Sequence, residues 1–158
     1  MVLGLLATAL SWALFALTFG RFRRRPSLHN ALYSLGLLFF ALAVSAELLA
    51  RLQGGWSPFL YRLWYLTGAM HGVTFLGLGS LALLRPRAAR GLLLALSPLF
   101  LWGLYLVASA PLDLARLPAP YAPLGAALPP PGPTSPRPRT LPFNLLGPLP
   151  LAGVALHT

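Results

Sequence analysis

The sequence predicts an all-α integral membrane helical bundle, and three observations support this prediction. Of its 158 residues, 57% are hydrophobic and only 9% are charged, whereas a soluble domain carries about 25% charged residues. The apolar residues form runs of roughly 20, the length that crosses a hydrocarbon core about 30 Å thick. The charged residues fall mainly in short loops between those runs. We therefore predict four transmembrane helices and part of a fifth.

The first predicted span is Met1–Phe19. A cleaved signal peptide has a positively charged region before its apolar run, but here no charged side chain precedes the run and four arginines follow it. We therefore expect a retained helix. Because positively charged loops stay in the cytoplasm, the N-terminus is expected outside. The loop expected inside holds four basic residues, Arg21, Arg23, Arg24 and Arg25.

The basic loop after the first span has two interpretations. Arginines beside a membrane attract anionic lipid, at about 1 kcal/mol each near the surface, so the loop is a candidate site for anionic lipid. The simpler interpretation is that the arginines only set the topology. Pro26 prevents one continuous helix here, and Ser27 or Asn30 is expected to cap the next helix.

The second predicted span, Ala31–Ala50, holds the carboxylate of Glu47 about one turn from its outer end. An intramembrane acid is costly and often functional, so Glu47 is a candidate proton or cation ligand. The alternative is an interfacial ion pair with Arg51, which stands four residues later in the favourable order. This ion pair is the simpler interpretation.

The third predicted span, Leu60–Leu84, organises the bundle. Gly68 and Gly72 stand four residues apart, so they lie on one helix face and would let another helix approach closely. His71 is the one histidine inside a complete predicted span. It is either a ligand-binding or proton-relay group that faces the bundle interior, or a neutral residue hydrogen-bonded to a neighbouring helix. The second interpretation is the simpler one.

Aromatic residues gather at the outer end of the third span and in the short connection before it. Trp and Tyr are enriched where a membrane meets water. These residues are therefore expected to form an interfacial belt, made of Trp56, Tyr61, Trp64 and Tyr65.

Glu47 and His71 together form the candidate intramembrane polar site, and we predict that they lie on the same side of the membrane, facing the interior between the second and third spans. If the two side chains meet, the pair is a candidate proton relay. If Glu47 instead pairs with Arg51, His71 is left as a lone packed polar group. Counting about 1.5 Å per residue from the outer end places Glu47 roughly 6 Å deep and His71 roughly 12 Å deep. A single bridging water would then join the two side chains between the second and third spans.

The fourth predicted span, Gly91–Ala110, contains Pro98, which should kink it. A tight basic loop, residues 85–90, precedes this span. The loops assigned to the inside then hold seven arginines, and the loop assigned to the outside holds two, Arg51 and Arg62. This asymmetry predicts a multi-pass protein of the inner (plasma) membrane with its N-terminus outside.

Residues 1–110 thus form the predicted four-helix region, and the composition changes after it. Residues 111–140 are rich in proline, which predicts an external loop without a regular helix. Residues 141–158 are apolar again and predict the start of a further, incomplete helix. We therefore expect an N-terminal part of a longer bundle, completed by further C-terminal helices or by a second copy of the chain.

Catalytic and cofactor-binding patterns are missing from the sequence, so we expect no enzyme, no cofactor and no metal site. No two histidines stand at metal-ligand spacing, and there is no HExxH motif. The chain has no Lys, which excludes a Schiff-base retinal site, and it has no Cys. Its net charge of +10 comes from arginines in short loops, which argues against the basic face of a nucleic-acid-binding protein.

Several segments resemble a group of uncharacterised membrane proteins of about seven spans from GC-rich bacteria. The similar segments are residues 63–69 (LWYLTGA), 76–81 (LGLGSL), 110–113 (APLD) and 141–147 (LPFNLLG). The resemblance implies a polytopic membrane protein and brings no known activity or catalytic residues. The basic loop after the first helix and the aromatic outer ends are also similar to the seven-helix membrane input region of some bacterial sensor kinases.

Two functions fit these features. The first hypothesis is a binding or sensing bundle, which would be favoured if the full gene continued into a signalling domain. The alternative is a transporter or transporter subunit, which would be favoured if further helices repeated the first ones in inverted topology.

Overall fold

The computed structural model describes residues 1–112, and all regular secondary structure in that range is helical. The predicted external loop from residue 113 onward and the predicted further helix at 141–158 lie outside the described residues. The elements are α1 (Val2–Arg24), α2 (Leu28–Leu52), α3 (Pro58–Trp64), the π-helix η1 (Tyr65–Gly72), α4 (Val73–Leu84) and α5 (Pro86–Ser109).

Four helices in the described part of the chain are long and apolar enough to cross a membrane. They are α1, α2, α5 and one continuous helix of 27 residues, Pro58–Leu84, that joins α3, η1 and α4. We call this continuous helix the third span. The predicted fold class, an all-α membrane bundle with four complete spans, is confirmed.

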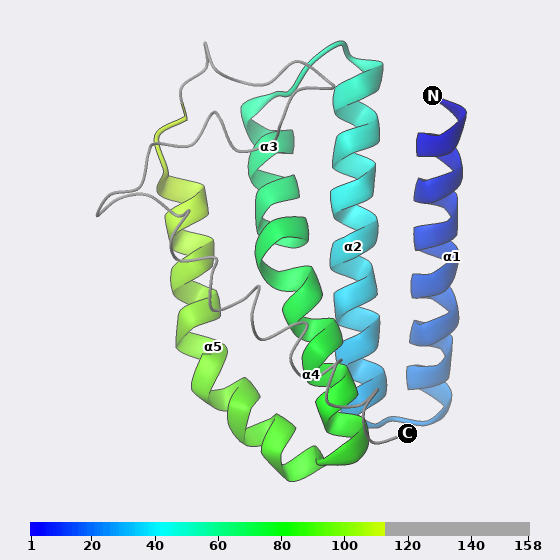
Figure 1. Cartoon of the computed structure of the whole chain (residues 1–158), viewed down its shortest axis with the longest axis vertical. Helices are drawn as coiled ribbons and strands as arrows, with labels where there is room; N and C mark the ends of the chain where they lie inside the picture. The colour runs from blue at the N-terminus through cyan, green and yellow to red at the C-terminus, as the bar shows by residue number, and fades with distance from the viewer. Residues whose placement is uncertain (113–158) are drawn as a thin grey trace.

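Neighbouring helices run in opposite directions (Figure 1). In that view α2 lies between α1 and the third span, and α5 lies on the other side of the third span. The N-terminus and the α2–α3 connection are at one end of the bundle, and the α1–α2 and α4–α5 turns are at the other. Of the residues in the most apolar stretch of the third span, 61% are buried inside the described bundle. The corresponding share for α1 is 6%. The third span is therefore the centre of the bundle.

The connections between helices use the capping residues expected from the sequence. Ser27 Oγ accepts a hydrogen bond from the Asn30 N–H at the start of α2, at 3.4 Å. Asn30 Nδ2 in turn donates to the Arg25 carbonyl at 3.0 Å and ties the end of α1 to α2. After α2, Gly54 has φ +80°, and the Gly55 N–H donates back to the Ala50 carbonyl at 2.9 Å. This arrangement satisfies the last carbonyls of α2.

The aromatic residues around the start of the third span pack within the bundle, and their position at a membrane interface stays a prediction. Trp56, Tyr61 and Tyr65 are all buried. The Trp56 ring meets the rings of Tyr61 and Trp64 edge to face, each at 6.0 Å between centroids. These side chains belong to one buried hydrophobic cluster that also includes Val107 of α5.

The crossing between α2 and α4 is very close. A Cβ atom added at Gly36 would lie 2.8 Å from Leu76 Cγ and 3.0 Å from its backbone nitrogen. One added at Gly79 would lie 3.1 Å from the Tyr33 ring. The Tyr33 hydroxyl is 2.8 Å from Ser80 Oγ. Small residues therefore let the two backbones approach, and a polar contact joins them.

Helix α5 is curved (Figure 1) and contains Pro98, where the sequence predicts a kink. Pro98 has no N–H to donate to the Leu94 carbonyl one turn earlier. Ser97 Oγ donates to that carbonyl instead, at 2.8 Å. The hydroxyl thus satisfies a backbone acceptor that lipid could not.

Candidate functional site

The π-helix η1 lies in the middle of the third span and is the most unusual backbone feature of the bundle. It has eight residues. In a π-helix the backbone N–H of each residue donates to the carbonyl of the residue five positions earlier. Such helices are rare, occur mostly as single turns, and often lie at functional sites. The wider turn brings the Thr67 carbonyl oxygen to only 2.7 Å from where a Cβ of residue 72 would stand. Gly72 therefore leaves room for the π-helical carbonyl, which another residue would not.

His71 is part of η1 and is buried, with 5% of its surface exposed. Its Nδ1 atom lies 2.8 Å from the Leu66 carbonyl oxygen, which belongs to the residue five positions earlier. A carbonyl oxygen only accepts, so Nδ1 carries a proton and donates it to Leu66. The imidazole therefore hydrogen-bonds to the backbone of its own span. Its acceptor is five residues earlier, which is the spacing of the π-helical backbone hydrogen bonds.

Three phenylalanines surround the His71 ring: Phe75 follows His71 in the third span, and Phe39 and Phe100 come from α2 and α5. The ring centroid lies 6.1 Å from Phe39 of α2, 6.4 Å from Phe75 of α4 and 5.3 Å from Phe100 of α5. Phe75 also stacks on Phe100 at 4.9 Å and meets Phe39 edge to face at 5.5 Å. We call these four rings the His71 cluster. It links η1 to every helix that packs on the third span.

Glu47 lies elsewhere and has its own partner. Its carboxylate pairs with Arg51 four residues later, and each side chain is about one third exposed, at 33% and 32%. The ion pair of the second interpretation is therefore formed, and its position at a membrane interface stays a prediction. His71 packs at the level of Phe39, which is eight residues, or about 12 Å, along α2 from Glu47. A proton relay between Glu47 and His71 stays a prediction, and it would need more than one bridging water.

Gly68 and Gly72 both face α2. A Cβ added at Gly68 would lie 3.0 Å from Ala43 Cβ, and one added at Gly72 would lie 3.8 Å from the Gly36 carbonyl oxygen. The sequence analysis missed Gly36, which is the tightest position on the α2 side. The signal was available, because small residues recur every seven positions on one face of α2, at Gly36, Ala43 and Ala50.

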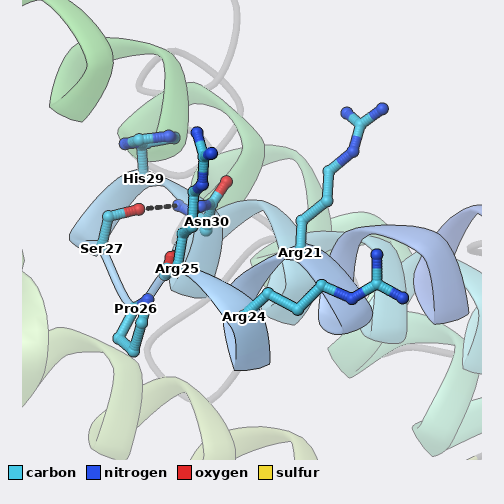
Figure 2. Close-up of a pocket in the computed structure, with 7 residues that line it drawn as sticks. All are labelled: Arg21, Arg24, Arg25, Pro26, Ser27, His29 and Asn30. Atoms are coloured by element: carbon cyan, nitrogen blue, oxygen red, sulfur yellow. Dashed lines mark hydrogen bonds between the residues drawn. The ribbon is translucent and has the colours of Figure 1, made fainter.

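The basic residues after the first span separate into two groups. Arg21, Arg24 and Arg25 line a pocket of about 620 Å³ at the α1–α2 turn, together with Pro26, Ser27, His29 and Asn30 (Figure 2). Arg23 is not among the residues that line it. A second hollow of about 480 Å³ lies at the other basic turn, around residues 85–88.

Comparisons with known proteins do not identify the chain. No protein family model, no curated protein and no solved structure matches it. Within residues 1–112, no three His, Asp or Glu side chains come together as a metal ion would require. The site must therefore be interpreted from its own geometry.

Proposed function

We propose that this protein is a multi-pass inner-membrane bundle with its N-terminus outside and a binding or sensing role, in which η1 is the segment that changes state. The arrangement of charge supports the orientation. The α1–α2 and α4–α5 turns, at one end of the bundle (Figure 1), carry seven arginines. The opposite end carries Arg51 and Arg62, and Arg51 is paired with Glu47. Such an excess of arginine marks the cytoplasmic side.

Cysteine labelling tests this orientation without background, because the chain has no cysteine of its own. Gln53→Cys and Ala88→Cys place one thiol at an exposed position at each end of the bundle. In intact bacterial cells, a membrane-impermeant maleimide should label Gln53→Cys at once. It should label Ala88→Cys only after the inner membrane is opened. The reverse pattern would overturn the proposed topology, and labelling of both in intact cells would overturn the multi-pass arrangement.

The observation that carries the sensing role is the π-helix with His71 bonded to Leu66 inside it. A π-helical segment has the α-helix as an alternative conformation. The α-helix is far more common, and its hydrogen bonds join residues four apart instead of five. Conversion to the α-helical register would turn residues on one side of η1 by about 100° relative to the other. That rotation would take His71 away from its cluster. A segment with two such registers gives a signal two discrete states to select between.

The His71 cluster supplies the coupling that a sensor needs. Because Phe39 belongs to α2 and Phe100 to α5, a change at His71 acts on both helices that pack beside it, and through Phe75 on the rest of the third span. α4 and α5 lead directly to the basic turn at residues 85–90. A change within the membrane is thereby passed to the end of the bundle that we assign to the cytoplasm. Transport, the alternative from the sequence, has no specific contact among residues 1–112 in its favour.

Hydrogen–deuterium exchange on the whole chain in lipid nanodiscs tests whether η1 has two states. Amides of residues 65–72 should exchange faster than those of the α2 segment beside them, because a change of register breaks their hydrogen bonds. Deletion of Ala69 removes the extra residue and should slow exchange at η1 to the rate of α2. Gly91→Ala, at an open position in α5, is the control and should change neither rate. Slow exchange of η1 in the unaltered protein, equal to that of α2, would contradict the sensing role.

A further inference from the structure

Arg62 lies near the start of the third span and is in contact with the end of α5. Its Nη2 atom donates a hydrogen bond to the Ala110 carbonyl oxygen at 3.0 Å, and Ala110 is the residue that caps α5. A positively charged side chain at this place complements the negative end of the helix dipole. The contact therefore joins the third span to α5 at the end of the bundle that holds the α2–α3 connection (Figure 1).

This contact satisfies only part of the Arg62 guanidinium. The side chain is half-buried, and its Nε atom is buried without a hydrogen-bond partner among residues 1–112. Burying part of a charged group is costly unless an opposite charge or further acceptors face it. A guanidinium presents its donors in a planar fork that matches the two oxygens of a carboxylate. A carboxylate is therefore the partner that would complete Arg62.

The chain has two carboxylate side chains, Glu47 and Asp113. Glu47 is paired with Arg51. That pair lies on the α1 side of the bundle, because Arg51 Nη1 is 3.8 Å from where a Cβ of Gly4 in α1 would stand, whereas α5 is on the other side of the third span (Figure 1). Asp113 is thus the carboxylate of the chain that can serve Arg62.

The chain after α5 leads toward Arg62. Leu112, the last residue that the structure describes, packs against the buried cluster that contains Ala110 and Tyr61, the neighbour of Arg62. Asp113 follows Leu112 directly. It stands three residues after Ala110, so their Cα atoms are within about 11 Å of each other. Because Arg62 already touches Ala110, the two charged side chains can meet.

We propose that Asp113 forms an ion pair with Arg62 and so fixes the chain after α5 to the third span. Both carboxylates of the chain then pair with the two arginines that we assign to the outside, Arg51 and Arg62. The charges at that end cancel, which strengthens the contrast with the seven arginines of the opposite turns. This proposal does not depend on the sensing role of η1.

A double-mutant cycle on the whole chain measures the pairing, with unfolding by SDS from a mild detergent followed by circular dichroism. Asp113→Asn should raise the unfolding equilibrium constant about three- to fivefold. Arg62→Gln should raise it further, because this variant also loses the bond to Ala110. In the Arg62→Gln chain, Asp113→Asn should have no further effect. An equal effect of Asp113→Asn with and without Arg62 would overturn the ion pair.

Two further arginine variants control this cycle. Arg51→Gln makes the same change of charge at another half-buried arginine, and Asp113→Asn should keep its full effect in that chain. Arg116 stands three residues after Asp113 in the sequence and is the competing partner. If Asp113→Asn lost its effect in the Arg116→Gln chain and kept it in the Arg62→Gln chain, the proposal would fail.

Cross-linking gives a second test that does not depend on stability. The chain has no cysteine of its own, so thiols can be placed in pairs. A short bismaleimide should join Arg62→Cys to Asp113→Cys in the folded chain, and it should not join Arg51→Cys to Asp113→Cys. Mass spectrometry of the digested protein detects the joined peptides. Equal cross-linking of the two pairs, or none in either, would contradict the proposed position of Asp113.

Discussion

Gly36→Leu is expected to separate α2 from α4 and to cause the largest loss of stability of any single substitution in the bundle. Even the first carbon of the new side chain would stand 2.8 Å from Leu76 Cγ and 3.0 Å from the Leu76 backbone nitrogen. The Leu76 side chain can rotate, but its backbone cannot move without shifting α4. Overpacking of this kind costs about 3 kcal/mol or more of the free energy of unfolding. Unfolding with SDS from a mild detergent, followed by circular dichroism, measures this free energy.

Gly20→Leu is the matched control for this prediction. Gly20 is also in a membrane-length helix, but a Cβ added there would meet nothing within 4 Å in the described structure. Leucine is a better helix former than glycine by about 0.8 kcal/mol. Gly20→Leu should therefore leave the unfolding free energy unchanged or raise it slightly. If Gly36→Leu were as stable as Gly20→Leu, the close α2–α4 crossing would be wrong.

The spans were predictable because crossing a membrane depends on length and apolar composition, which the sequence carries directly. Their ends were less predictable. The predicted first span ends at Phe19, but α1 continues to Arg24, because arginine is a good helix former and the first residue that stops the helix is Pro26. Helix α5 likewise begins at Pro86 and not at Gly91, since proline is favoured in the first turn of a helix.

The direction in which side chains face was harder to predict than the spans. Hydropathy places Trp56 and Tyr61 near a membrane surface, but it does not say whether they face lipid or the neighbouring helix. In the bundle both are buried, in a cluster that includes Val107 of α5, which is 46 residues from Tyr61 in the sequence. The same limit applies to the arginines. Four arginines within residues 21–25 predict a charged turn, but they do not predict that Arg24 lines the pocket and Arg23 does not.

The π-helix has no counterpart in a sequence pattern read at 3.6 residues per turn. Gly68, Gly72 and His71 were recognised as unusual, and Gly68 and Gly72 face α2. The phenylalanines that complete the His71 cluster come from residues 39, 75 and 100. They are brought together only by the extra residue in η1 and by the packing of three helices. Tertiary packing therefore decides the local register here, and no local preference predicts it.

Gly72→Ala tests the π-helix itself and is expected to have the second-largest effect. The added methyl carbon would lie 2.7 Å from the Thr67 carbonyl oxygen, which is backbone of the same turn. Neither group can move aside while η1 keeps its register. The substitution should therefore lower the free energy of unfolding by about 2–3 kcal/mol, measured in the same SDS titration. It should also release His71 from Leu66, because their 2.8 Å contact depends on the π-helical repeat.

A second variant distinguishes this strain from ordinary loss of packing. Deleting Ala69 in the Gly72→Ala chain removes the extra residue, so the third span can continue as an α-helix. The Thr67 carbonyl would then no longer press on residue 72, and much of the lost stability should return. A π-helical turn accommodates one extra residue within a single wider turn. Removing that residue therefore restores an α-helix, and the residues after the deletion still face α2 as before. If the deletion instead added its own loss to that of Gly72→Ala, the π-helical register would not be the source of the strain at residue 72.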